Sequence, residues 1–265
     1  MGEVIVITSG KGGVGKTTSV ANIGCALAQA GKKVVLLDAD VGLRNLDIVM
    51  GLENRVVYDF VDVIDARCRL RQALIKDKRF DELYLLAASQ TKDKSDVDIE
   101  KMKRLTEELK ESYDYILIDC AAGIEHGFQT AVAGADRAIV VATPETTSVR
   151  DADRIIERLE VLEKKSEILI NKVRPSMIRK GTSLRIDEVI EVLAVDLAGV
   201  VPDDEEIIVA ANKGVPAVMN KKSRAGLAYT NTAKRIMGEK VPIMDLEDDK
   251  TLGFKLRRIF SGKTT

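Results

Sequence analysis

The segment GKGGVGKT at residues 10–17 constrains the fold more than any other stretch of this chain. It fits the pattern G-x-x-x-x-G-K-[ST], and it stands between an apolar run typical of a strand and a periodic run typical of a helix. Glycines let consecutive backbone N–H groups turn onto oxyanions, and the N-terminus of the following helix adds the positive end of its dipole. The segment therefore predicts a phosphate-binding loop between a strand and a helix.

Runs rich in β-branched residues alternate with helical patterns along the rest of the chain. Strands are predicted at Glu3–Ile7, Lys33–Asp38, Leu83–Ala87, Tyr115–Asp119, Ala138–Ala142, Glu167–Asn171 and Ala198–Val201. Helices are predicted at Thr17–Ala30, Ile99–Ser112, Ser148–Lys164, Ile186–Leu193 and Arg224–Met237. The strands are apolar without alternation, as in a parallel sheet covered on both faces. We expect an α/β fold: a doubly wound, mostly parallel sheet of about seven or eight strands flanked by helices.

Composition excludes several classes of protein. The net charge of −1 argues against a chain that coats nucleic acid, and the absence of tryptophan argues against base-stacking platforms. A single histidine, His126, leaves no zinc site or histidine relay, so we assign it no role. Three scattered cysteines indicate a reducing compartment, with Cys25 and Cys120 as core residues. We see no signal peptide and no apolar run of the ~20 residues that a spanning helix needs.

The phosphate loop assigns roles to its own residues. Lys16 is placed to reach the β- and γ-phosphates, and the Thr17 hydroxyl is placed to join a Mg²⁺ shell. The nucleotide-binding residues are then expected to be Gly10, Lys11, Gly12, Gly13, Val14, Gly15, Lys16, Thr17 and Thr18. Lys11 is not needed by the minimal pattern, and a long cation this early in the loop would more easily point toward a neighbouring molecule.

The octapeptide KGGVGKTT resembles the deviant Walker A signature of the MinD/ParA family of P-loop ATPases. That resemblance implies hydrolysis of ATP to ADP and phosphate with Mg²⁺, and a homodimer in the ATP-bound state. It also implies that Lys11 crosses the dimer interface to the nucleotide of the partner, while Lys16 serves the nucleotide of its own subunit. Lys11 and Lys16 are therefore expected to be catalytic.

Aspartates stand at the ends of two apolar strands. VVLLDAD carries Asp38 and Asp40, and YILIDCAAG carries Asp119 in a Walker B arrangement. Ligands collect at the carboxyl ends of strands in open α/β sheets. By resemblance, Asp40 positions the attacking water, while Asp38, Asp119 and Thr17 serve Mg²⁺ or its waters. We expect the segments after these strands, residues 40–50 and 119–126, to switch with the γ-phosphate.

Two further strand ends concern the base. By resemblance, Asn171 and Pro202 flank the adenine. The residue after Val173 is an arginine, so the N-K-x-D guanine signature is absent, which favours ATP over GTP.

The C-terminal residues form a small basic amphipathic pattern. On a helix from about residue 251 to 262, Leu252, Leu256, Ile259 and Phe260 share one face. Phe254 falls off this face, so either the helix starts later or its ring sits at the edge. We expect residues 1–242 to be the ATPase domain, 243–250 a linker and 251–265 a membrane-targeting tail with these five residues as contacts. A terminal helix docked on the domain, or a frayed end, is the alternative. Ordering about ten residues offsets most of the gain from burying one tail, so two tails in one dimer are needed for firm binding.

The resemblance extends to DVGLRNLDIVMG, RVVYDFVDVI and SVRDADRI, and it covers nearly the whole chain. It implies a cytoplasmic ATPase, peripheral on the inner face of the membrane, that binds anionic lipid, recruits a MinC-like division inhibitor and is released by a MinE-like activator. Partner contacts are expected near Arg44, Asp151 and Arg154, although a solvated helix face would carry the same residues. No specific nucleic acid is expected.

Three other classes share the loop. A ParA-type DNA-segregation ATPase would bind DNA with strong salt dependence, and the amphipathic tail argues against it. A flagellar-number regulator would differ only in its partner. An iron–sulfur carrier ATPase needs bridging cysteines, and Cys120 has no C-x-x-C partner.

Overall fold

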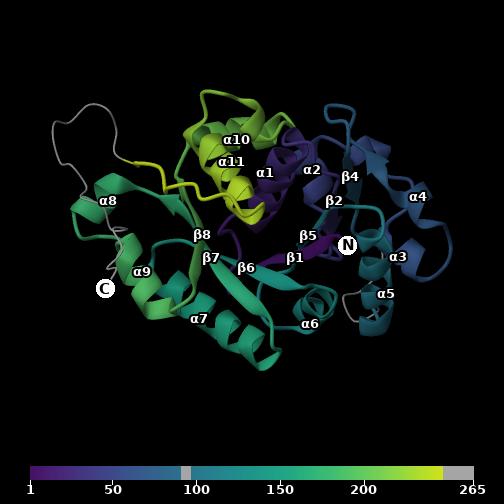
Figure 1. Ribbon diagram of the computed structural model, residues 1–265, viewed down its shortest axis with the longest axis horizontal. Coiled ribbons are helices and arrows are strands. Elements are labelled where there is room, and N and C mark those ends of the chain that lie inside the picture. Colours follow the sequence, from purple (N-terminus) through teal and green to yellow (C-terminus); the bar gives the residue numbers. More distant parts are fainter. Residues whose placement is uncertain (91–96, 247–265) are drawn as a thin grey trace.

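The protein, a computed structural model that describes residues 1–90 and 97–246, is built on one eight-stranded sheet (Figure 1). The strand order is β3-β4-β2-β5-β1-β6-β7-β8, and every neighbouring pair is parallel except β3 with β4. The strands are β1 (Glu3–Thr8), β2 (Val34–Asp38), β3 (Ile75–Lys76), β4 (Leu83–Leu86), β5 (Tyr115–Asp119), β6 (Arg137–Ala142), β7 (Lys165–Val173) and β8 (Asp196–Pro202).

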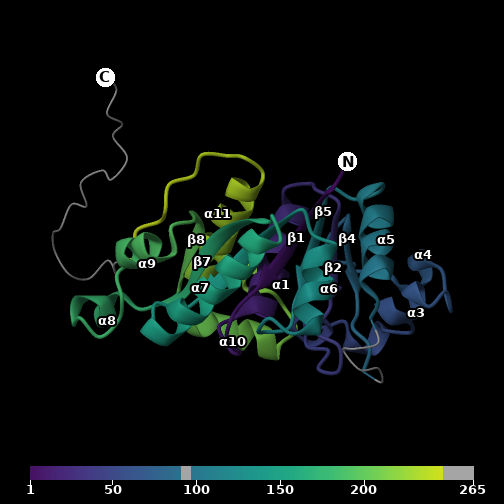
Figure 2. The same cartoon turned by 90° about the horizontal axis from the view of Figure 1, so that it is seen from below.

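Helices cover both faces of the sheet, as Figure 1 shows. On one face lie α1, α10 and α11, and on the other lie α6, α7 and α9, which stand in front of the strands in Figure 2. The α-helices are α1 (Lys16–Gln29), α2 (Leu46–Met50), α3 (Phe60–Ile64), α4 (Leu70–Ala73), α5 (Ile99–Lys110), α6 (His126–Ala133), α7 (Thr146–Val161), α8 (Pro175–Arg179), α9 (Ile186–Leu193), α10 (Glu205–Asn212) and α11 (Arg224–Ile236). Short 3-10 turns lie at Glu53–Arg55 and Ala217–Met219.

The central strand β1 shows why apolar runs become buried strands here. Val4, Ile5, Val6 and Ile7 are all fully buried. Successive side chains point to opposite faces of a strand, so Val4 and Val6 enter the core under α5–α7, while Ile5 and Ile7 enter the core under α1 and α11. One strand therefore ties two hydrophobic cores together, and at its carboxyl end the chain must turn into the phosphate loop.

The fold class predicted from the sequence is confirmed. All seven predicted strands are present, and β5 and α9 have the predicted bounds. The sequence missed β3, which has two residues, and it missed short helices such as α3, α8 and α10. The helix α6 begins at His126, so the second predicted switch segment ends where a helix starts.

Some predictions fall outside the described residues. The tail at 251–265 with its five membrane contacts, and the second half of the linker at 243–250, lie there. Within residues 1–90 and 97–246, no helix is both long and apolar enough to cross a bilayer.

Candidate nucleotide-binding site

The phosphate loop connects the carboxyl end of β1 to the N-terminus of α1, as predicted. Gly13 and Gly15 have φ of 78° and 102°, in the left-handed region where a side chain is unfavourable. The Ser9 hydroxyl donates to the Lys11 carbonyl at 2.8 Å and so braces the loop on itself. Among the described residues no side chain caps α1, and its first turn holds no carboxylate. The first N–H groups of α1 and its dipole therefore favour an anion here.

Two glycines are required by close approach to other elements. A Cβ on Gly10 would lie 2.3 Å from the backbone oxygen of Asp151 in α7. A Cβ on Gly15 would lie 2.3 Å from Nδ2 of Asn171 at the end of β7. The loop is thus packed between α7 and β7, and its shape depends on contacts that its own sequence does not reveal.

Asp38 and Asp119 lie directly opposite one another, because β2 and β5 pair them in register. Both are almost fully buried. Asp38 accepts hydrogen bonds from the N–H groups of Asp40 and Leu46, at 3.0 and 3.2 Å, whereas Oδ1 of Asp119 has no partner among the described residues. Two buried carboxylates therefore meet beside the phosphate loop, and one oxygen of Asp119 is left without a hydrogen-bond donor among the described residues.

The environment of this pair favours protonation. Burial raises the pKa of Asp119 well above the usual aspartate range, and the charge of Asp38 raises it further, while a hydrogen bond from Thr17 and the charge of Lys16 oppose the rise. The pKa of Asp38 is also raised, first by burial, and it is held back by its two backbone donors. A divalent cation would remove this penalty, since it stabilises the ionised forms.

The residues present fit a magnesium–nucleotide complex. Thr17, Asp38 and Asp119 would supply oxygen ligands or hold waters, and phosphate oxygens would complete the shell, as Mg²⁺ prefers. Within the described residues no cluster of three or more His, Cys, Asp or Glu side chains exists that would form an all-protein metal cage. When bound, Mg²⁺ would supply charge stabilisation for the transferring phosphoryl group.

The first predicted switch segment is anchored by Asp38. Its carboxylate holds the N–H of Leu46, where α2 begins. Between them, Arg44 has a φ of 46° and its Nε lies 2.6 Å from Oδ2 of the buried Asp47. Arg44 thus holds the segment in shape, a role that the sequence did not suggest. Its predicted contact with a partner protein remains a prediction.

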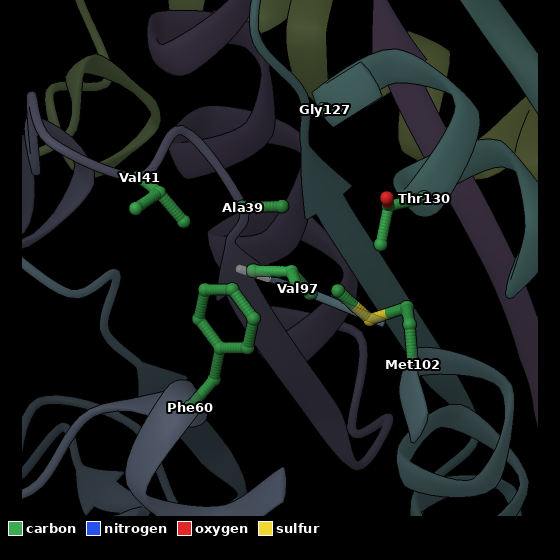
Figure 3. Close-up of a pocket in the computed structure, with 7 residues that line it drawn as sticks. All are labelled: Ala39, Val41, Phe60, Val97, Met102, Gly127 and Thr130. Atoms are coloured by element: carbon green, nitrogen blue, oxygen red, sulfur yellow. The ribbon is translucent and has the colours of Figure 1, made fainter. Parts of the chain in front are cut away.

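A small, mostly apolar void lies beside the start of the first predicted switch segment and the start of α6 (Figure 3). Its volume is about 10 Å³, the space of one water molecule at most, so it is not a nucleotide pocket. The lining comes from residues after β2, from α3, from the start of α5 and from α6: Ala39, Val41, Phe60, Val97, Met102, Gly127 and Thr130. His126 is placed beside it, with Nε2 3.0 Å from the Val97 carbonyl oxygen.

Lys11 behaves differently from Lys16 in this single chain. Its side chain is half exposed, and Nζ lies 3.9 Å from Oε2 of Glu145 at the start of α7, a loose contact across the mouth of the loop. Lys16, in contrast, stands close enough to lower the pKa of the buried Asp119. An exposed Lys11 leaves the ammonium accessible to a second molecule, and its role there stays a prediction.

The residues predicted to flank the base have a structural role. Asn171 is buried, and its Nδ2 donates to the Val14 carbonyl at 2.8 Å. Pro202 lies opposite Val173 where β7 and β8 end. The predicted contact of Asn171 and Pro202 with adenine stays a prediction. Sequence reasoning missed Lys172, whose Nζ donates to the Gly13 carbonyl at 2.7 Å.

Comparison with known proteins agrees with this site. Residues 5–217 match the CobQ/CobB/MinD/ParA nucleotide binding domain. The septum site-determining protein MinD of Bacillus subtilis is 54% identical over 264 residues, covering 98% of both chains. MinD of Synechocystis is 49% identical, covering 99% of this chain and 100% of its own.

Solved structures extend the likeness to three dimensions. MinD in a MinC:MinD cell division complex of Aquifex aeolicus superposes with a TM-score of 0.86 at 48% identity, covering 92% of this chain and 99% of that one. MinD of Pyrococcus horikoshii complexed with Mg-ADP has a TM-score of 0.80 at 28% identity, covering 91% and 100%. The phosphate loop, the aspartate pair and these full-length matches together show that the chain belongs to the MinD septum site-determining ATPases of the CobQ/CobB/MinD/ParA nucleotide-binding family.

Proposed function

We propose that this ATPase is a membrane switch: ATP-bound subunits dimerise, the dimer binds anionic lipid through two tails, and hydrolysis releases it. The observation that supports the proposal is the half-exposed Lys11 at the mouth of the loop, in contrast to Lys16, which lies close to the buried Asp119. A second subunit carrying ATP would give Lys11 a phosphate partner far stronger than its 3.9 Å contact with Glu145.

Hydrolysis would involve three side chains in separate roles. Lys16 and the N–H groups of the loop hold the phosphates, and Lys11 of the second subunit adds charge where the transferring group becomes more negative. Asp40, which follows the β2 strand end, would orient the attacking water. The backbone between Asp38 and Leu46 would then respond to loss of the γ-phosphate, since Asp38 links the cation site to α2.

Membrane attachment would come from residues 251–265. Leu252, Leu256, Ile259 and Phe260 would supply the apolar surface, and Phe254 would join them if the helix starts later or its ring sits at the edge. Neighbouring basic residues would add about 1 kcal/mol each near an anionic bilayer. One tail binds weakly, and a dimer gains through effective concentration. ATP would therefore control membrane binding through the number of linked tails.

The partner would be a MinC-like inhibitor of division, as in the related Aquifex aeolicus complex. A MinE-like activator, or another factor that sets position in the cell, would stimulate hydrolysis. We propose that both bind the exposed side of α7 near Asp151 and Arg154, beside the phosphate loop, whose Gly10 packs against α7.

Sedimentation with vesicles tests the proposal. The full chain is mixed with vesicles of anionic and zwitterionic lipid, or with duplex DNA, in Mg-ATP or Mg-ADP. Pelleting with anionic vesicles in ATP alone is the expected result, and residues 1–246 without the tail should stay in solution. Lys11→Ala should lose both ATP-dependent dimers and pelleting. Lys165→Met, at the first residue of β7 and away from the phosphate loop, should behave as the unmodified chain.

Two outcomes would overturn the switch. Pelleting with DNA and not with lipid would assign the chain to DNA segregation. Pelleting that is equal in ATP and ADP, or unaffected by removal of the tail, would show that the nucleotide does not control the membrane. The inhibitor is tested in the same assay, since MinC should join the pellet only when the ATPase does.

A further inference from the structure

The pairing of β7 with β8 is irregular near the carboxyl end of β7. Ile170 pairs with Val200 and Val173 pairs with Pro202, so β7 advances three residues while β8 advances two. The extra residue makes a β-bulge, and Lys172 within it has a φ of 55°. A non-glycine residue in the left-handed region is unfavourable, and such bulges re-aim side chains near functional sites.

The bulge directs two neighbouring side chains to one target. In a regular strand Asn171 and Lys172 would point to opposite faces. Here Nδ2 of Asn171 donates to the Val14 carbonyl at 2.8 Å, and Nζ of Lys172 donates to the Gly13 carbonyl at 2.7 Å. Two successive carbonyls of the phosphate loop are thus held from the same side by two successive residues of β7.

Because peptide units are planar, these two carbonyl contacts also orient the N–H groups of the same peptide units. In a trans peptide the N–H points opposite to the C=O of the same unit. The Gly13 carbonyl shares its peptide with the Val14 N–H, and the Val14 carbonyl shares its peptide with the Gly15 N–H. Holding both carbonyls toward β7 therefore holds both N–H groups away from β7, toward the concave side of the loop that takes phosphate oxyanions.

We propose that Lys172 is a positioning residue for nucleotide binding: with Asn171 it fixes the two peptide units whose N–H groups face the phosphates. Lys172 does not touch the nucleotide in this role. Its ammonium donates to the Gly13 carbonyl on the side of the loop that faces β7. The N–H groups on the other side of the loop would donate to the β-phosphate. The proposal goes beyond the membrane switch, because it concerns binding of nucleotide to one chain.

The test measures the affinity of the full chain for fluorescent Mg-ADP, with four substitutions. Lys172→Met removes the donor and keeps the stem, and Lys172→Gly removes the donor while easing the positive φ. Both should weaken binding by about threefold to tenfold, the range expected for one charge-assisted hydrogen bond at an exposed site. Lys172→Arg keeps a donor and should recover most of the affinity. The control, Lys165→Met, changes an exposed lysine at the other end of the same strand and should bind as the unmodified chain.

A second readout separates positioning from general stability. The ³¹P resonance of the β-phosphate in bound ADP should shift in Lys172→Met and return toward its original position in Lys172→Arg. Lys172→Gly decides between side chain and backbone: if it binds Mg-ADP as tightly as the unmodified chain, the ammonium is not the positioning group. The proposal is also overturned if Lys172→Met changes neither affinity nor the resonance, or if Lys165→Met weakens binding equally.

The result does not depend on partners or lipid. Loss of ATP-dependent membrane binding with unchanged Mg-ADP affinity in Lys172→Met would count against the positioning role. Failure of the unmodified chain to bind lipid would leave the positioning role intact, since only Mg-ADP binding to one subunit is measured.

Discussion

Asp38 and Asp119 face each other across β2 and β5, two buried carboxylates in register at the edge of the phosphate loop. Burial raises the pKa of both carboxyls, and the charge of Asp38 raises the pKa of Asp119 further. Oδ1 of Asp119 has no partner among residues 1–90 and 97–246. The pair destabilises the protein until a cation arrives, so stability and function are opposed at this site.

Asp119→Asn should therefore stabilise the nucleotide-free protein at high pH. A carboxyl whose pKa is higher in the folded state contributes stability that is present at low pH and lost as pH rises through the folded pKa. The unmodified chain should lose free energy of unfolding as pH rises from the ordinary aspartate range through neutrality, and Asp119→Asn should lose less. At pH ~8 the variant should be more stable by about 1–3 kcal/mol, measured by urea unfolding without nucleotide.

The same variant should fail to hold Mg-nucleotide, because an amide cannot replace the negative charge. The matched control is Asp196→Asn, at the exposed first residue of β8, far from the carboxyl ends of the strands. It should change neither the pH dependence of unfolding nor the binding of Mg-nucleotide. An Asp119→Asn protein that is less stable than the unmodified chain at both ends of the pH range would contradict this account of the pair.

Gly10→Ala and Gly12→Ala should separate the two kinds of glycine in the loop. A Cβ at Gly10 would lie 2.3 Å from the Asp151 backbone oxygen, whereas one at Gly12 has no heavy atom within 4 Å among the described residues. Gly10→Ala should lose about 1–3 kcal/mol of unfolding free energy without nucleotide, because backbone must move. Gly12→Ala should stay within about 0.5 kcal/mol. Equal losses in thermal or urea unfolding would show that α7 does not constrain the loop.

Arg79→Met should destabilise the protein strongly. The Arg79 guanidinium lies 2.6 Å from the buried carboxylate of Asp77 and donates to the backbone oxygens of Met50 and Gly214. It thus joins the end of α2 to the turn after α10. Removing one partner of a buried pair leaves a buried charge, and we expect a loss of about 3 kcal/mol in urea unfolding.

The control for Arg79 is Arg185→Met, which breaks an exposed pair with Asp187 and should cause no measurable change. Adding Asp77→Asn to Arg79→Met should recover part of the loss, since the buried charge is then gone. No recovery would mean that the lost backbone hydrogen bonds, and not the uncompensated charge, dominate.

Tyr229→Phe should loosen the support of α1. Ser19 donates its proton to the Gly15 carbonyl at 2.8 Å, so its oxygen accepts from the Tyr229 hydroxyl at 3.1 Å. Loss of one buried hydrogen bond should lower the free energy of unfolding by about 1 kcal/mol. A double-mutant cycle with Ser19→Ala checks this, because strict additivity of the two losses would show that the hydroxyls do not interact.

The local pattern of apolar residues is sufficient to predict the strands and helices that bury a regular face. Tyr115–Asp119 and Ile186–Leu193 were predicted with their observed bounds, since continuous and 3.6-residue apolar periodicity report burial directly. It failed for α10, which buries none of its residues and so carries no such periodicity. It failed for β3, whose two residues are a strand only because β4 pairs with them.

The sequence by itself determined that a phosphate loop joins a strand to a helix and that aspartates end two other strands, because these depend on residues close along the chain. Only the tertiary structure decided which side chains meet. Asp38 faces Asp119 because β5 lies between β2 and β1 in the sheet, and Asn171 and Lys172 reach the loop because a bulge turns them the same way. Contacts across 157 and 159 residues follow from sheet order and register, which no local period contains.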